Sequence, residues 1–366
     1  MNDASDETSL MDEVPEAQDF LQEVLGNIDQ YSVIGDEPVA DYIQGILATT
    51  SIDAQGEAFG QEALEALVTM VNTQGLWMTV AHDPLIHPQG RFFAAKMFYA
   101  PHSRTHFVVG VGGLYDSSKL KRFADFGIET LTHGAILEPE PELEPDSESG
   151  TDPMLITIGA NPHEIDFAVL EDLLSDAPPS VSREIETHFR KSLDTLLTIL
   201  TFVIPIAALA KSPFFKKYQE QLATPAAEAT LDALRWLKEK VVAVVASKAN
   251  RRLLYHFSSP YKGSELGFYI DSNDPSVAIA AIDSVVGAAH LAMKLIEHLQ
   301  PYGVERVAYV FDHRKSKAWL PLYAVTRNAG VITDQPQLIS MERFRGLSLG
   351  GSAERRLLGN GDGDGE

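Results

Sequence analysis

The residues best suited to chemistry in this sequence are histidines between positions 82 and 106. His82, Asp83 and His87 lie close together near the ends of strand-like runs. Imidazole nitrogens and a carboxylate oxygen form a ligand set that suits zinc and related metals. However, the H-E-x-x-H spacing of zinc hydrolases is absent. Surface histidines at strand ends are the simpler interpretation, and a metal-dependent hydrolase that uses these three residues is an alternative.

Two glycine motifs match known signatures without the context that those signatures need. Gly346, Ser348 and Gly350 fit the G-x-S-x-G nucleophile elbow, but no histidine follows them to act as the base. The glycines in 110–113 follow a strand, yet Tyr115 stands where a dinucleotide-binding fingerprint has its third glycine. The chain also has no cysteine, which excludes disulfides and thiol nucleophiles. We therefore predict no cofactor and favour a protein that is not an enzyme.

The charge of the chain is concentrated in a few segments. The 366 residues carry a net charge of −23, and residues 1–90 contain 17 acids but no Lys or Arg. Residues 138–153 add seven acids and four prolines. Such acidic, proline-containing segments are typical of solvated chain. We predict an acidic, largely disordered arm with a short helix over 1–60, a solvated loop over 138–153 and a flexible tail over 341–366.

This charge distribution bears on the partner. Nucleic-acid binding is disfavoured, because neutralising phosphates requires an excess of basic residues. An acidic arm instead suits another protein of basic character, or a basic patch on its own body. An anionic lipid headgroup is an alternative ligand for that patch. The residues predicted to form it are Arg251, Arg252, Arg314, Lys315 and Lys317.

Hydrophobic periodicity and turn residues predict an α+β module over 61–178, interrupted by the acidic loop. A helix precedes three strands, and a further strand and helix follow the loop. This order favours an antiparallel sheet with helices on one side. It resembles small secretion-chaperone-like folds, and the resemblance implies binding to a partner protein. The elements are expected at 61–75, 76–81, 91–100, 106–115, 154–158 and from 161 onward.

The most apolar stretch of the chain is 193–210, within a region predicted to be helical over 179–250. A helix that spans a bilayer needs about 20 apolar residues. This segment is shorter and contains a central proline, so its insertion is marginal. We predict a kinked helix buried inside the protein, with a membrane-inserting segment as the alternative. The residues that would contact either the core or lipid include Leu196, Leu200, Phe202, Pro205 and Ile206.

The pattern over 251–340 predicts two strands, a helix that begins near Asp274, and two further strands. The whole chain is thus expected to be α+β, with two antiparallel-sheet modules joined by a helical, strongly apolar middle region. No secretory signal is visible, which favours a cytoplasmic protein, with membrane association as the alternative. The predicted function is a non-enzymatic protein-binding or regulatory role. A membrane-active or membrane-anchored protein and a metal-dependent hydrolase are the alternatives.

Overall fold

A computed structural model shows that the chain is α+β and divides into two compact units. Unit 1 consists of residues 1–121, 191–195 and 327–366, and unit 2 consists of residues 122–190 and 196–326. The structure describes residues 10–31, 39–52, 59–79, 83–128, 156–160, 167–187, 197–203, 232–242 and 252–334.

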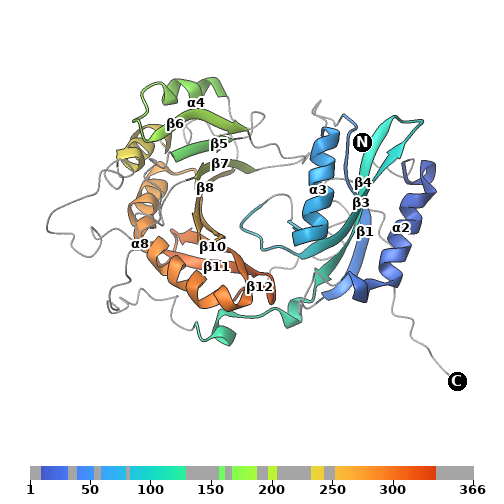
Figure 1. The fold of residues 1–366 in the computed structure, drawn as a ribbon. Helices are drawn as coiled ribbons and strands as arrows, with labels where there is room; N and C mark the ends of the chain where they lie inside the picture. Colours follow the sequence, from blue (N-terminus) through green and yellow to red (C-terminus); the bar gives the residue numbers. More distant parts are fainter. Residues whose placement is uncertain are drawn as a thin grey trace. The chain divides into compact units, whose positions relative to one another are not determined.

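Unit 1 is built around a four-stranded antiparallel sheet in the order β1-β4-β3-β2. One helix packs against each face of this sheet (Figure 1): α2 covers Phe93 and Phe107, and α3 covers Phe92 and Val108. The prediction of helices on one side only was therefore wrong. The elements are α2 (Pro15–Gly26), η1 (Ile28–Gln30), β1 (Val39–Thr49), α3 (Gln61–Gln74), β2 (Leu76–Trp77), β3 (Gly90–Ala100), β4 (Thr105–Tyr115) and the 3₁₀ turn η2 (Ser117–Lys119).

Helix α3 and strand β2 are joined by a turn that requires glycine. Leu64 and Val71 form the buried stripe of α3, and the helix ends at Gly75, as predicted. Gly75 has φ +74°, and a Cβ there would collide with the side chain of Arg91. Strand β2 pairs with β3 through Leu76 and Trp77, and the Met78 N–H adds one bond to the Gly90 carbonyl, although the sequence predicted a strand over 76–81. The brevity of β2 leaves most of β3 without a described neighbour on that side.

The predicted acidic arm over 1–60 is folded wherever the structure describes it. Helix α2 agrees with the short helix expected in this region, and its Leu21 and Val24 are buried against the sheet. Strand β1, which the sequence did not predict, pairs along its length with β4. Glu13 accepts hydrogen bonds from the backbone N–H of His102 and from the Ser103 hydroxyl (2.6 Å) in the β3–β4 turn. These bonds lower the pKa of Glu13, the one from the Ser103 hydroxyl most strongly.

An eight-stranded sheet has the order β12-β11-β10-β9-β8-β7-β5-β6. All of its strands except β12 belong to unit 2. Long helix α8 packs against β9, β10 and β11. The described elements from residue 122 onward are η3 (Phe123–Phe126), β5 (Ile156–Ala160), α4 (Phe167–Leu174), β6 (Val181–Thr187), β7 (Leu197–Val203), π-helical η5 (Leu237–Val242), β8 (Arg252–Tyr261), β9 (Ser264–Asp271), α8 (Pro275–Leu299), η6 (Gln300–Tyr302), β10 (Val304–Asp312), β11 (Ala318–Thr326) and β12 (Gly330–Ile332).

Over 252–326 the structure has two strands, a helix and two strands in the predicted order, and the short β12 follows them; the sheet is mixed rather than antiparallel. β9 and β10 are parallel neighbours because α8 carries the chain back along the sheet between them. Asp274 starts this helix as predicted: its carboxylate accepts the Ser276 N–H at 2.9 Å. β5 and α4, predicted to belong to the first module, lie in unit 2.

The apolar middle segment is a strand where the structure describes it, not a helix. β7 pairs in parallel with β8 and antiparallel with β5, so both of its edges are hydrogen-bonded. Leu200 and Phe202 are fully buried there, while Leu196, Pro205 and Ile206 lie outside the described residues. Within the described parts of the chain, no single helix is long and apolar enough to cross a membrane. The bent pair 275–285 and 287–302 passes that test of length and composition only when taken together.

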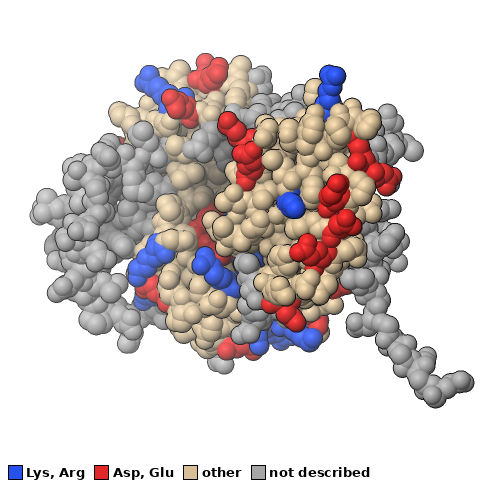
Figure 2. Space-filling model, turned by 45° about the vertical axis from the view of Figure 1, so that its right-hand side comes forward, with Lys and Arg blue, Asp and Glu red and all other residues tan. Residues whose placement is uncertain are grey.

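Helices α2 and α3 of unit 1 carry acidic side chains and no basic ones. Exposed acids occur on both: Glu16, Asp19 and Glu23 on α2, and Glu62 and Glu65 on α3. None of them forms an ion pair with a described Lys or Arg; the described ion pairs of unit 1 lie elsewhere. Figure 2 shows Asp and Glu side chains spread over the right-hand part of the surface, with few Lys or Arg among them.

Candidate functional site

The three residues predicted to bind a metal are not assembled into a site in the described structure. Asp83 uses a carboxylate oxygen to accept the Leu85 N–H at 2.9 Å, which shapes a turn. His87 is buried, and its Nδ1–H donates to the Pro88 carbonyl at 2.8 Å. Burial lowers the pKa of His87. His82 lies outside the described residues, among which no three His, Asp or Glu side chains are placed to hold a metal ion.

The predicted basic patch is described in part. Arg314, Lys315 and Lys317 are exposed in the turn between β10 and β11. The Asp312 carboxylate holds this turn by accepting the N–H groups of residues 314–316, and these bonds lower its pKa to about 2. Arg252 binds both carboxylate oxygens of Asp271, at 2.8 and 2.9 Å, so its charge is already matched. Arg251 lies outside the described residues.

The outer edge of β3 is the feature of unit 1 that is best arranged to bind something. Only Arg91 and Phe92 pair with β2, and no other described strand lies on that side. Outward backbone groups of an edge strand are free to pair with another extended chain. The edge runs between α2 on one face of the sheet and α3 on the other.

Asn72 of α3 takes the place of a strand neighbour at one position of this edge. Its Nδ2 donates to the Ala95 carbonyl at 2.9 Å, and its Oδ1 accepts the Ala95 N–H at 2.8 Å. Ala95 therefore points its N–H and C=O away from β4. Because backbone groups alternate in direction along a strand, those of Met97 and Tyr99 point to the same outer side. No bulge interrupts the pairing of β3 with β4 over these residues.

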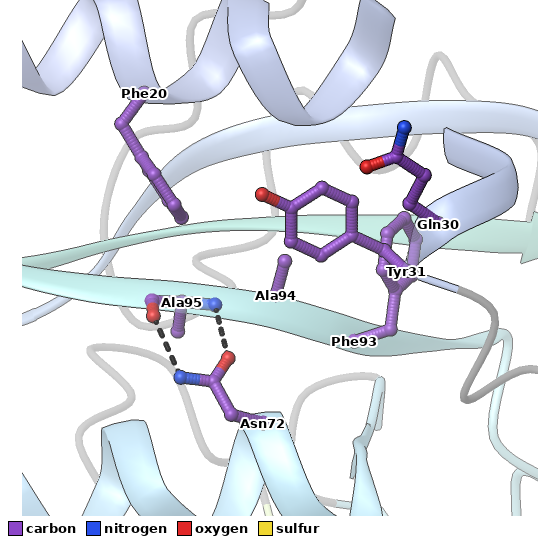
Figure 3. A pocket seen from close by; sticks show the side chains of 7 residues that line it. All are labelled: Phe20, Gln30, Tyr31, Asn72, Phe93, Ala94 and Ala95. Atoms are coloured by element: carbon purple, nitrogen blue, oxygen red, sulfur yellow. Dashed lines mark hydrogen bonds between the residues drawn. The ribbon is translucent and has the colours of Figure 1, made fainter. Parts of the chain in front are cut away.

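A cavity of about 420 Å³ opens beside this edge (Figure 3). Phe20 reaches the cavity from α2, Tyr31 follows η1, and Asn72 approaches from the other side of β3. Its walls are apolar and polar in nearly equal parts: aromatic rings supply the apolar surface, and the amides of Gln30 and Asn72 supply hydrogen-bonding groups. The residues that line it are Phe20, Gln30, Tyr31, Asn72, Phe93, Ala94 and Ala95.

The cavity depends on a local irregularity in β3. The register between β3 and β4 shifts between Phe92 and Ala94, which marks a β-bulge. Phe93 and Ala94 consequently both belong to the cluster that packs against α2, while Ala95 packs on the α3 side. Bulges often redirect side chains next to functional sites. Here the bulge places two successive side chains in the wall of the cavity.

The edge carries an exposed aromatic side chain, and the helices on the two faces of the sheet carry exposed acids. Tyr99 on β3 is 47% exposed. Tyr99 also contacts the ring of His106, with centroids 4.7 Å apart. Lys96 is the one basic residue of β3 beyond Arg91, and its ammonium lies over the rings of Phe20 and Phe98. An apolar edge among acids suits a ligand with both apolar and basic groups.

A second polar cluster lies in unit 2 on β8, β9 and β10. Glu265 accepts from Arg306 at 2.8 Å and from the Ser258 hydroxyl at 3.2 Å, and His256 Nε2 lies 3.5 Å away. Burial alone would raise the pKa of Glu265, but the His256 hydrogen bond and the Arg306 charge lower it to about 2. The cluster satisfies its charges internally, so it serves the stability of the sheet.

Compared with models of protein families, with curated proteins and with solved structures, the chain has no significant match, so the site is interpreted from its own chemistry. The sequence did not indicate Asn72 or Phe20 as site residues. Asn72 contacts a residue 23 positions away, and periodicity does not reveal such a contact. The short run between Gly75 and Gly90 was the one available signal of an incomplete neighbour strand.

Proposed function

We propose that unit 1 is a protein-binding module that receives an extended, basic segment of another protein along the outer edge of β3. The observation that carries this proposal is the pair of outward-facing residues Met97 and Tyr99, whose backbone groups meet no described strand. An added strand would supply the missing backbone hydrogen bonds, and its alternate side chains would contact the two sheet faces.

Charge complementarity supports a basic segment. The helices on the two faces of the sheet, α2 and α3, both carry exposed acids, and no Lys or Arg occurs on either helix. Lys or Arg side chains of an added strand would be attracted to these carboxylates. Exposed charges act mainly on the rate of association and on the choice of partner, so binding should weaken as the salt concentration rises.

The test compares two ten-residue peptides, one of alternating Lys and Val and one of alternating Glu and Val. We expect the Lys peptide alone to bind at low salt and to slow hydrogen exchange of the Met97 and Tyr99 amides. Equal binding of both peptides, or binding without protection of these amides, would overturn the proposal. Isothermal titration calorimetry and exchange measured by NMR give the two readouts.

A matched pair of variants tests the backbone contact itself. Met97→Pro removes an outward N–H without removing a hydrogen bond to β4, because proline is tolerated where an edge N–H faces away from the sheet. Met97→Ala shortens the same side chain but keeps the N–H. The Lys peptide should bind Met97→Ala at least fivefold more tightly than Met97→Pro. Equal affinity for two folded variants would show that β3 is not the binding edge.

A further inference from the structure

We infer that the cavity beside β3 holds one bulky apolar side chain of the bound segment and that Asn72 fixes where this side chain falls. The inference rests on the strand addition proposed above and specifies the ligand further: a short basic strand followed by an apolar anchor residue. It is built from the Asn72–Ala95 hydrogen bonds and from the residues that line the cavity.

Asn72 limits how far an added strand can pair. Its amide already occupies both outward groups of Ala95, so a strand that pairs with Tyr99 and Met97 finds no free partner at the next position. Residues two apart on a strand are separated by about 7 Å. The backbone of the added segment must therefore leave β3 within about two residues of Met97.

The cavity lies at the point where the pairing ends. Ala95, which Asn72 occupies, is itself part of the cavity wall, together with Ala94. Asn72 approaches from the α3 side, whereas Phe20 and Tyr31 stand on the opposite side of β3 (Figure 3). A segment that is turned aside by Asn72 is thus directed toward the space in front of these rings.

The walls of the cavity define the kind of side chain that it can hold. Three aromatic rings, of Phe20, Tyr31 and Phe93, and the methyl group of Ala94 form its apolar surface, and Ala95 lines it from β3. No described Asp, Glu, Lys or Arg lines it. A space of about 420 Å³ accommodates Leu, Met or an aromatic ring, and a methyl group would leave most of it unfilled. Burial of the larger side chain gains affinity in proportion to the apolar area removed from water.

The experiment uses the full-length chain and variants of the Lys–Val peptide in which the Val nearest either end is replaced by Ala, Leu or Phe. We expect the better of the two Phe peptides to bind about tenfold more tightly than its Ala counterpart. Gln30→Trp fills the cavity from its rim and should reduce this ratio to less than twofold. Gln22→Trp places the same ring on an exposed position of α2 that does not line the cavity, and it should keep the ratio.

A second variant tests the role of Asn72. Asn72→Ala frees the N–H and C=O of Ala95, so the added strand can pair one position further along. In this variant, hydrogen exchange of the Ala95 amide should be fast without peptide and slow with it. In the original protein Asn72 protects this amide in both states. The preference for Phe over Ala at the original peptide position should fall at least threefold in Asn72→Ala.

The outcomes separate the anchor from the strand addition on which it rests. If the Ala, Leu and Phe variants of the Lys–Val peptide bind equally and all protect the Met97 and Tyr99 amides, strand addition holds and the anchor is wrong. An unchanged Phe-to-Ala ratio in folded Gln30→Trp overturns the anchor as well. If no peptide binds or protects β3, both proposals are overturned.

Discussion

The two units of this chain differ in whether their described acidic side chains form ion pairs. In unit 2, described acids and bases pair with each other, as in Arg252–Asp271 and Lys262–Glu297, and Glu265–Arg306 forms the most buried of these pairs. In unit 1, the acids on α2 and α3 have no described Lys or Arg partner. The described ion pairs thus offset part of the charge of unit 2, whereas the acids on α2 and α3 leave negative charge on the surface of unit 1. Of the net charge of −23, the residues of unit 1 carry −14 and those of unit 2 carry −9.

The two sheets also differ in how completely their strand edges are paired. The larger sheet gives β7, β8, β9 and β10 a strand on both sides. The smaller sheet ends in a strand of two residues and uses an asparagine side chain to cover part of the remaining edge. Each difference leaves unit 1 more open to an external chain than unit 2.

The largest expected effect concerns the core of unit 2. Phe202 is fully buried on β7 and stacks on Phe257, with centroids 5.1 Å apart. Phe202→Ala should lower the free energy of unfolding by about 3–5 kcal/mol, measured by urea denaturation in the absence of lipid. The exposed Arg235→Ala is the control and should cost less than about 0.5 kcal/mol. A Phe202→Ala protein of unchanged stability in water would show that β7 is not a core strand. The contrast between a closed sheet in unit 2 and an open sheet edge in unit 1 would then no longer hold.

An intermediate effect is expected where unit 2 pairs its charges. Glu265→Gln leaves Arg306 without its anion and should cost about 2 kcal/mol at pH 7. The pKa of Glu265 is lowered to about 2 in the folded protein, below the ordinary value of 4.5. Its stabilising contribution is thus complete above pH 4.5 and is lost as the pH falls toward 2.

The free energy of unfolding, measured across this pH range, should change less with pH for Glu265→Gln than for the original protein. Asp271→Asn, in the same strand but in a more exposed pair, is the matched control and should cost less than about 1 kcal/mol. Parallel pH profiles for Glu265→Gln and the original protein would mean that internal charge pairing does not distinguish unit 2.

The smallest expected effect concerns Lys96, the cation closest to the open edge of β3. Its ammonium lies 5.7 Å from the Phe20 ring centre and 5.2 Å from that of Phe98. Lys96→Met should cost about 0.5 kcal/mol of stability through the lost cation–π contacts. It should also raise the affinity for the Lys–Val peptide two- to threefold at low salt, because it makes the edge more negative. A lower affinity would contradict the view that unit 1 selects its ligand by negative charge.

The sequence predicted elements well where one local signal was sufficient. Gly75 ends α3 where expected, and Asp274 with Pro275 starts α8. The parallel pairing of β9 with β10 was not predicted, because two hairpin-like patterns around a helix suggest antiparallel strands. A long helix that joins two neighbouring strands instead returns the chain to the same end of the sheet.

The apolar segment shows why a hydrophobic run alone is ambiguous. β7 is buried between β5 and β8, and a strand with both faces covered has a continuous apolar sequence, as a buried helix does. Its β-branched residues, including Thr198, Ile199 and Thr201, were the signal in favour of a strand. The candidate site was less predictable, because it arises where Asn72, Phe20 and Ala95 meet from three different elements.

The position of β1 in its sheet has a consequence for the order in which the chain folds. β1 precedes β3 and β4 in sequence, yet among the described strands it pairs with β4, whose partner residues come 58 to 76 positions later. At a synthesis rate of 5–20 residues per second, β1 waits about 3–15 s for its partner to be made. The β3–β4 hairpin, joined by a short turn, forms within microseconds of its own completion. We therefore expect β1 to join a hairpin that already exists, and until then Ile43 and Ile46 lack the β4 residues that pair with them in the folded sheet.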